Sequence, residues 1–291
     1  MLSIRQFSAG ENDPNYEQLK LTDLEIRPDL KGKDLISLQE NLALFDDLSA
    51  FENQPIRTVV IKNWPNEEFL YHVFLRLNTG SVSLSPQELR QALHPGPFVS
   101  FLDRASSESP ALQEILNIKK PDFRMRDAEL LLRYYGFHNY MNEYTGNLKA
   151  FLDATCGKLN TAWGSKQDEL LNQLNEFEQA HQALQSVFGL DAYRKWNGKS
   201  YERRFNRAVF DIQILTFAHE DVRVAARDRA EQIQHAFETL CETDPAFLNA
   251  LETTTKSIRS THTRLVTWTR TINNLLKLKL PLPRLINTET Y

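Results

Sequence analysis

The chain has 291 residues, of which 41% are hydrophobic and 25% charged, so its composition is that of a globular protein with one large domain or two smaller ones. The formal net charge of −4 argues against adhesion to nucleic acid over the whole surface, but it leaves room for a local basic face. No apolar run approaches the roughly 18 residues that a membrane span requires. Cys156 and Cys241 have no neighbours at metal-ligand spacing, so we expect free thiols in a reducing cytoplasm.

Residues 1–96 are predicted to mix short helices and strands. Leu2–Phe7 resembles the end of a helix, and Tyr16–Leu30 alternates like one or two short strands. Ile56–Ile61 is rich in β-branched residues and is bounded by prolines, so it is the clearest strand in the chain. A single strand leaves its backbone groups unpaired, so we expect neighbouring strands beside it.

Two capping boxes mark helix starts in this region. Ser37 with Glu40 predicts a helix that buries Leu38, Leu42, Phe45 and Leu48. Ser85, followed by proline and then by Glu88, predicts a second start.

The stretch Phe69–Leu93 (FLYHVFLRLNTGSVSLSPQELRQAL) therefore reads as a helix, a tight turn and a capped second helix. Its turn is Asn78-Thr79-Gly80, where asparagine and glycine tolerate the left-handed conformation of a helix end.

The remainder, 97–291, is predicted to be a helical domain that begins after the His94-Pro95-Gly96-Pro97 breaker. Apolar periodicity places its helices at 98–105, 111–116, 126–144, 167–188, 201–219, 222–241 and 256–277. The helix at 201–219 is apolar on more than one side, so we expect it to be central and buried. Asp244-Pro245 is a further N-cap followed by proline.

The block from Phe74 to Leu93 resembles the F-x-R-L-N-T-G…L-S-x-Q-E-L-R-x-A-L signature of the GmrSD N-terminal domain family. The matching positions are Phe74, Arg76, Leu77, Asn78, Thr79, Gly80, Leu84, Gln87, Glu88, Leu89 and Arg90. Arg204–Asp211 and Thr253–Leu265 are similar to later blocks of the same family. The helices predicted along the chain indicate a mainly α protein, and the resemblance implies that 1–96 is a small α+β remnant of a ParB-like, sulfiredoxin-related domain. It further implies an NTP-dependent anti-phage restriction protein that attacks modified DNA with a nuclease partner.

His72, Arg76 and Asn78 are the nucleotide-binding candidates. His72 and Arg76 lie one helical turn apart, and imidazole and guanidinium groups both bind phosphate. Equally, Asn78 fits a simple helix C-cap and Arg76 a solvated charge. The family's Asp-Gly-Gln-Gln-Arg catalytic motif is missing, so we expect Met1 to fall just downstream of it. We therefore assign no catalytic residue, and expect NTP to be bound and hydrolysed only by a longer form.

Basic residues accumulate near the C-terminus. From Leu251 to Tyr291 there are seven lysines and arginines against two acids. Arg259, Arg264 and Arg270 are therefore the DNA-binding candidates, with a solvated helix face as the alternative. Two readings of the whole chain follow. It is a piece or short member of a GmrSD-type restriction protein, or it is a non-enzymatic protein-interaction module with a vestigial ParB-like region.

Overall fold

The chain forms two compact units, which we call the N-terminal unit (residues 1–81 and 118–122) and the helical unit (82–117 and 123–291). The computed structural model describes residues 2–10, 13, 16, 18–22, 24–55, 62, 69, 73, 84–252 and 257–284. The division lies at 81/82 rather than at the predicted 96/97, because the helix between these points packs with the helices that follow it.

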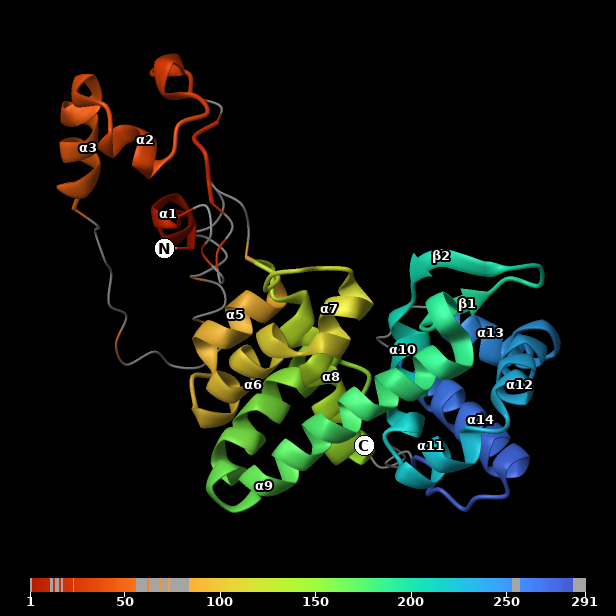
Figure 1. Cartoon of the computed structure of the whole chain (residues 1–291). Coiled ribbons are helices and arrows are strands. Elements are labelled where there is room, and N and C mark those ends of the chain that lie inside the picture. The colour runs from red at the N-terminus through yellow and green to blue at the C-terminus, as the bar shows by residue number, and fades with distance from the viewer. Residues whose placement is uncertain are drawn as a thin grey trace. The chain divides into compact units, whose positions relative to one another are not determined.

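Short helices make up the described part of the N-terminal unit (Figure 1). They are α1 (Leu2–Ser8), η1 (Pro28–Leu30), α2 (Leu35–Gln39), η2 (Leu42–Leu44) and α3 (Phe45–Glu52). Their buried side chains are Phe7, Leu30, Leu38 and Leu44. The ring of Phe7 meets that of Phe51 edge to face, with the ring centres 5.1 Å apart. This core is small, as is expected of so few turns of helix.

The predicted capping box at Ser37 is wrong. The carboxylate of Asp34 caps the helix instead, accepting a 2.8 Å hydrogen bond from the backbone N–H of Ser37. The helix therefore starts earlier and ends at Gln39. Of the four side chains that the longer helix was predicted to bury, Leu38 is buried and Leu48 packs against the core, whereas the other two are turned outward. Leu42 is 91% exposed and Phe45 is 63% exposed.

The predicted strands of this unit have different outcomes. Among the described residues of 16–30 there is no strand; a pair of backbone hydrogen bonds joins Leu21 to Gly32 and Lys33 instead. The predicted strand Ile56–Ile61 lies outside the described residues. The predicted helix and turn of 69–80 also lie outside them, apart from Phe69 and Val73, which are helical. The ParB-like character of this region stays a prediction.

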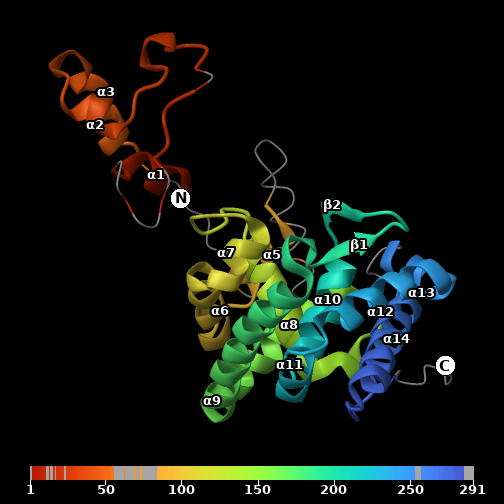
Figure 2. The same cartoon turned by 45° about the vertical axis from the view of Figure 1, so that its right-hand side comes forward.

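The helical unit consists of helices with one small hairpin (Figures 1 and 2). Its elements are α5 (Pro86–Leu93), α6 (Pro97–Glu108), α7 (Pro110–Leu116), α8 (Arg126–Tyr140), η3 (Met141–Glu143), α9 (Leu148–Phe188), η4 (Gly189–Asp191), β1 (Arg194–Trp196), β2 (Tyr201–Phe205), α10 (Arg207–Phe217), α11 (Glu220–Ala226), α12 (Ala230–Thr243), α13 (Pro245–Glu252) and α14 (Ile258–Leu276). In the described part of the chain no helix has both the length and the hydrophobicity of a membrane span.

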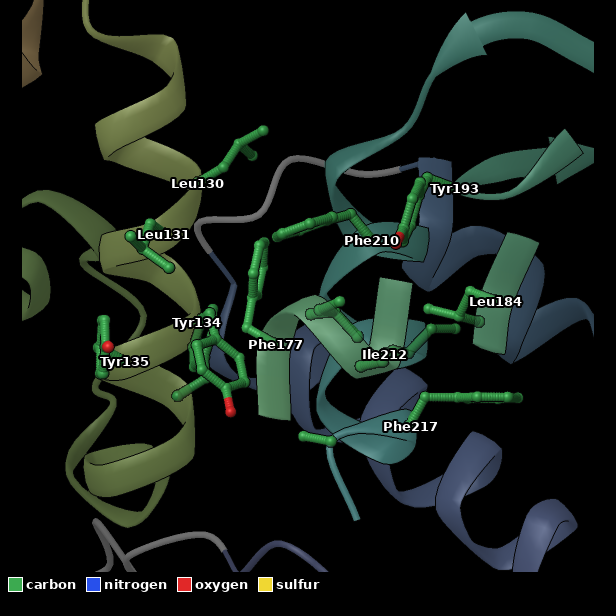
Figure 3. Packing of buried hydrophobic residues seen from close by; sticks show 14 of the residues in the cluster. Leu130, Leu131, Tyr134, Tyr135, Phe177, Leu184, Tyr193, Phe210, Ile212 and Phe217 are labelled. Atoms are coloured by element: carbon green, nitrogen blue, oxygen red, sulfur yellow. The ribbon is translucent and has the colours of Figure 1, made fainter. Parts of the chain in front are cut away.

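Helix α9 organises this unit. Its 41 residues extend for about 60 Å, and α6, α7, α8, α10, α11 and α12 all pack against it. A line of aromatic rings joins the three innermost helices (Figure 3): Tyr134 of α8 contacts Phe177 of α9, which contacts Phe210 of α10. As predicted, α10 is central, and nearly all of its side chains are buried.

Two caps predicted from the sequence are confirmed. Ser85 and Glu88 form a reciprocal capping box at the start of α5. The carboxylate of Asp244 accepts hydrogen bonds of 3.0 Å from the first backbone N–H groups of α13.

The predicted helix 201–219 is wrong in its first part, because residues 201–205 are the second strand of an antiparallel hairpin. Trp196 pairs with Tyr201, and the turn between them contains Gly198 at a φ of 88°. Asn206 then caps α10, accepting hydrogen bonds from the backbone N–H groups of Ala208 and Val209. An Asn-Gly pair between two strand-like residues is the sequence signal for such a hairpin. The predicted helix 222–241 is also divided, into α11 and α12.

Candidate functional site

The three nucleotide-binding candidates, His72, Arg76 and Asn78, lie outside the described residues, so their grouping stays a prediction. The second half of the signature is described and has a structural role. Arg90 is 3% exposed, and its Nε lies 2.6 Å from a carboxylate oxygen of Asp153 on α9. Gln87 is also buried and accepts a hydrogen bond from Arg90. These side chains hold α5 against the helical unit.

The basic candidates of α14 divide between the surface and the interior. Arg259 and Arg270 are exposed, whereas Arg264 is fully buried. Helical geometry explains the split: at roughly 100° per residue, Arg270 lies about 20° around the axis from Arg259, and Arg264 about 140°. Arg264 therefore cannot contact DNA from this position, which corrects the prediction for that residue.

Arg264 belongs to a buried charge network that joins three helices. The carboxylate of Asp211 on α10 accepts a hydrogen bond from Nε of Arg133 on α8 at 3.1 Å and from Nη2 of Arg264 at 3.3 Å. All three side chains are at most 1% exposed. Burial lowers the pKa of Arg264, and Asp211 opposes that effect. Two buried cations share one anion, so the network is a structural connection rather than an accessible site.

Unpaired cations gather instead on the hairpin. Lys199 lies in its turn, and Arg203 and Arg204 lie on β2; all three are exposed and have no acidic partner among the described residues. We call these three residues the hairpin patch. Figure 2 shows the hairpin projecting from the helices.

The inner side of the hairpin is fixed to α12. The indole N–H of Trp196 donates to Glu242 at 2.7 Å, and the ring of Tyr201 stacks on Phe237. Other basic residues of the hairpin are neutralised: Lys195 lies 2.9 Å from Glu202 and 2.6 Å from Glu252. The hairpin patch is therefore a set of unpaired cations on a hairpin that packs firmly against α12. Counting charges along the sequence does not identify it, because pairing is visible only in the structure.

One histidine lies between an acid and a hydroxyl. Nδ1 of His181 is 2.9 Å from the hydroxyl of Tyr193, and Nε2 is 2.9 Å from a carboxylate oxygen of Glu114. The order resembles that of a nucleophilic triad. Tyr193, however, is only 2% exposed, and burial raises the pKa of its hydroxyl well above the usual value. With no access for a substrate, this chain of hydrogen bonds connects α7, α9 and the residue that precedes β1, so His181 is a packed histidine with a structural role.

The remaining reactive groups of the described residues give no catalytic centre. Cys156 and Cys241 are free and buried, and burial raises the pKa of each thiol to about 12, so neither is a thiolate at neutral pH. No three His, Cys, Asp or Glu side chains of the described part group to hold a metal ion.

Comparisons with models of known families, with curated proteins and with solved structures found no match to this chain, so the GmrSD-type resemblance rests on the residues of the signature block.

Proposed function

We propose that the chain is a piece or short member of a GmrSD-type restriction protein of the cytoplasm, and that its helical unit contacts the DNA backbone. The chain itself does not hydrolyse NTP; a longer form with the catalytic motif would bind and process the nucleotide. A nuclease subunit would be the protein partner. The observation that carries the DNA contact is the hairpin patch, whose three cations lack acidic partners among the described residues while Lys195 beside them is paired.

The physical basis is neutralisation of phosphates. Free lysine and arginine side chains on a projecting strand reach phosphate oxygens and displace condensed counterions, which favours binding without reading sequence. Paired cations such as Lys195 would first have to give up a carboxylate. The exposed arginines of α14, Arg259 and Arg270, form a second surface with the same chemistry.

Fluorescence anisotropy with a labelled 20-base-pair duplex tests the proposal. If the three patch residues each contact one phosphate, affinity falls roughly 40-fold between 50 and 200 mM salt. The triple variant Lys199→Gln, Arg203→Gln, Arg204→Gln should lose nearly all of this salt dependence. The double variant Arg259→Gln, Arg270→Gln is the matched comparison. Binding that survives the triple variant and is lost in the double variant would assign the contact to α14, and binding lost in neither would reject a DNA contact at both surfaces.

A second function, a protein-interaction module, is favoured by the surface of the N-terminal unit. Ile26 is 91% exposed, as is Leu42, and Phe45 is 63% exposed. Large apolar side chains gathered on a surface often mark a contact site. An ion pair between Arg27 and Asp47 lies between the segments that carry these side chains.

Light scattering at increasing concentration separates this function from the first. An interaction surface of this kind predicts association that Leu42→Ser with Phe45→Ser abolishes and that the hairpin triple variant leaves unchanged. A chain that stays monomeric at all concentrations gives no support to the module.

A further inference from the structure

A pocket of about 250 Å³ lies where α8 and α10 end beside the middle of α14. Its last wall is the segment Leu280–Pro283, which follows α14. This wall is fixed in place. The side-chain amide of Asn273 donates to the carbonyl oxygen of Leu280 at 3.0 Å and accepts from its backbone N–H at 2.8 Å. Nε2 of His262 lies 3.1 Å from the carbonyl oxygen of Pro283. The pocket is therefore formed before any ligand arrives.

The hydrogen-bonding groups of the pocket are two imidazoles, the side-chain amide of Asn142 and the hydroxyls of Thr216 and Thr269. His138 lies in the last turn of α8 and His219 just beyond α10, and neither imidazole ring has a hydrogen-bond partner among the described residues. Burial lowers the pKa of His138, and the neighbouring His219 adds to that effect. Desolvation and then Arg223 lower the pKa of His219. Glu169 raises the pKa of His138 and Asp221 raises that of His219, each by less than the effects that lower it. Both rings are thus neutral near pH 7, and each has one N–H donor and one acceptor nitrogen.

The rest of the lining is uncharged. No Asp, Glu, Lys or Arg side chain lines the pocket, and its walls are largely leucine and proline, with Phe137 at one side. The hydroxyl of Thr216 donates to the carbonyl oxygen of Ile212 at 2.8 Å, so it is left with acceptor capacity only. An ionic ligand would lose its hydration without gaining a counter-charge. A ligand with apolar faces and a donor–acceptor edge satisfies both the walls and the imidazoles.

We propose that this pocket binds a small uncharged planar nitrogen heterocycle of the nucleobase type, with His138 and His219 hydrogen-bonded to its edge. The volume lies just below the range of about 300–1,000 Å³ that is typical for drug-sized ligands, which suits one or two fused rings. This site is separate from the hairpin patch and does not depend on the proposed DNA contact.

Isothermal titration calorimetry of the full chain with adenine, cytosine and uracil tests the site. At least one base should bind at pH 7.5, and the imidazole signals of His138 and His219 should shift in NMR spectra of that complex. His219→Ala should weaken binding about fivefold to tenfold, the usual effect of one lost hydrogen bond. His235→Ala is the matched control, because His235 is exposed on α12 and does not line the pocket.

The pH dependence separates this ligand class from an anion. Protonation removes the acceptor nitrogen of an imidazole, so binding of a neutral base should weaken as the pH falls toward 5. Benzoate, a ring of similar size with a negative charge, serves as the comparator. Three outcomes would overturn the proposal: no base binds, benzoate binds more tightly and gains affinity at low pH, or a folded double variant His138→Gln, His219→Ala binds the base as the wild type does.

Discussion

Asp211 is the shared anion of two buried arginines. Replacing it with alanine leaves Arg133 and Arg264 buried without a counter-charge. Loss of one partner of a buried pair typically costs about 3–5 kcal/mol. Urea unfolding followed by circular dichroism should show this loss for Asp211→Ala.

The comparison variant for this measurement is Glu143→Ala. It removes the ion pair with Lys158, in which both side chains are more than 40% exposed, and exposed pairs contribute at most about 1 kcal/mol. If the two variants lost similar free energies of unfolding, the buried network would contribute no more to stability than an exposed ion pair.

His138 makes stability depend on pH. Its pKa is lowered in the folded chain, chiefly by burial, whereas the unfolded chain takes up the proton near pH 6.5. The unfolded state therefore takes up the proton at a higher pH than the folded state does. The contribution of neutral His138 to the free energy of unfolding is complete above about pH 6.5, and it is lost as the pH falls through the lower pKa of the folded chain. Unfolding free energies measured from pH 7.5 to 5 should fall less steeply in His138→Gln than in the wild type. His235→Gln, at an exposed position, should keep the wild-type slope.

Arg264 also shows why single residues are hard to assign from a sequence. The count of basic residues near the C-terminus is correct, and Arg259 and Arg270 are on the surface as predicted. Arg264 precedes the buried Trp268 by one turn, and this spacing places it on the core face. Its partner Asp211 lies 53 residues away in the chain. No local pattern reveals that partner, so the sequence alone predicts a surface position for an arginine that is buried.

At the scale of an element, α14 ends in a strained residue. Lys277 has a φ of 60° and a ψ of 38°, the left-handed conformation that glycine adopts without cost. Lys277→Gly should therefore stabilise the chain by about 1 kcal/mol. Lys279→Gly loses the same charge at an exposed position where no positive φ is found, so it should be neutral or destabilising because glycine increases the entropy of the unfolded chain. If both variants shifted the melting temperature in the same direction by a similar amount, backbone strain at Lys277 would not be the cause.

Helix starts were predictable where the signal is local and complete. The capping box of Ser85 and the N-cap of Asp244 depend on side chains within three residues of the backbone they bind, and both are present. The start of α9 at Leu148 was missed by nineteen residues, since the prediction began at Gln167. Gly157 and Gly164 weaken the helical pattern there, and contacts with six other helices outweigh that weak propensity.

The described residues form two separate cores. The buried cluster of the N-terminal unit draws on residues 7–44, and that of the helical unit on residues 98–276. No residue is shared, so the described cores should respond to truncation independently. The sequence predicts the boundary at the Pro-Gly-Pro breaker. That motif marks a turn, but it does not show whether the helix before it packs with the N-terminal unit or with the helical unit.

Two truncated chains test where the helical unit begins. Residues 82–291 keep α5, with the buried Leu89 and the contact of Arg90 with Asp153, and should melt at the temperature of the helical unit in the whole chain. Residues 97–291 lack α5, which removes Arg90 from the carboxylate of Asp153 and uncovers apolar surface on α8. Burial of one leucine contributes about 1.5–3 kcal/mol, so this chain should melt roughly 3–12 °C lower. Tryptophan fluorescence, to which the fully buried Trp268 contributes, reports the transition of this unit. Equal melting temperatures for the two chains would place the boundary at 96/97 and make α5 a part of the linker.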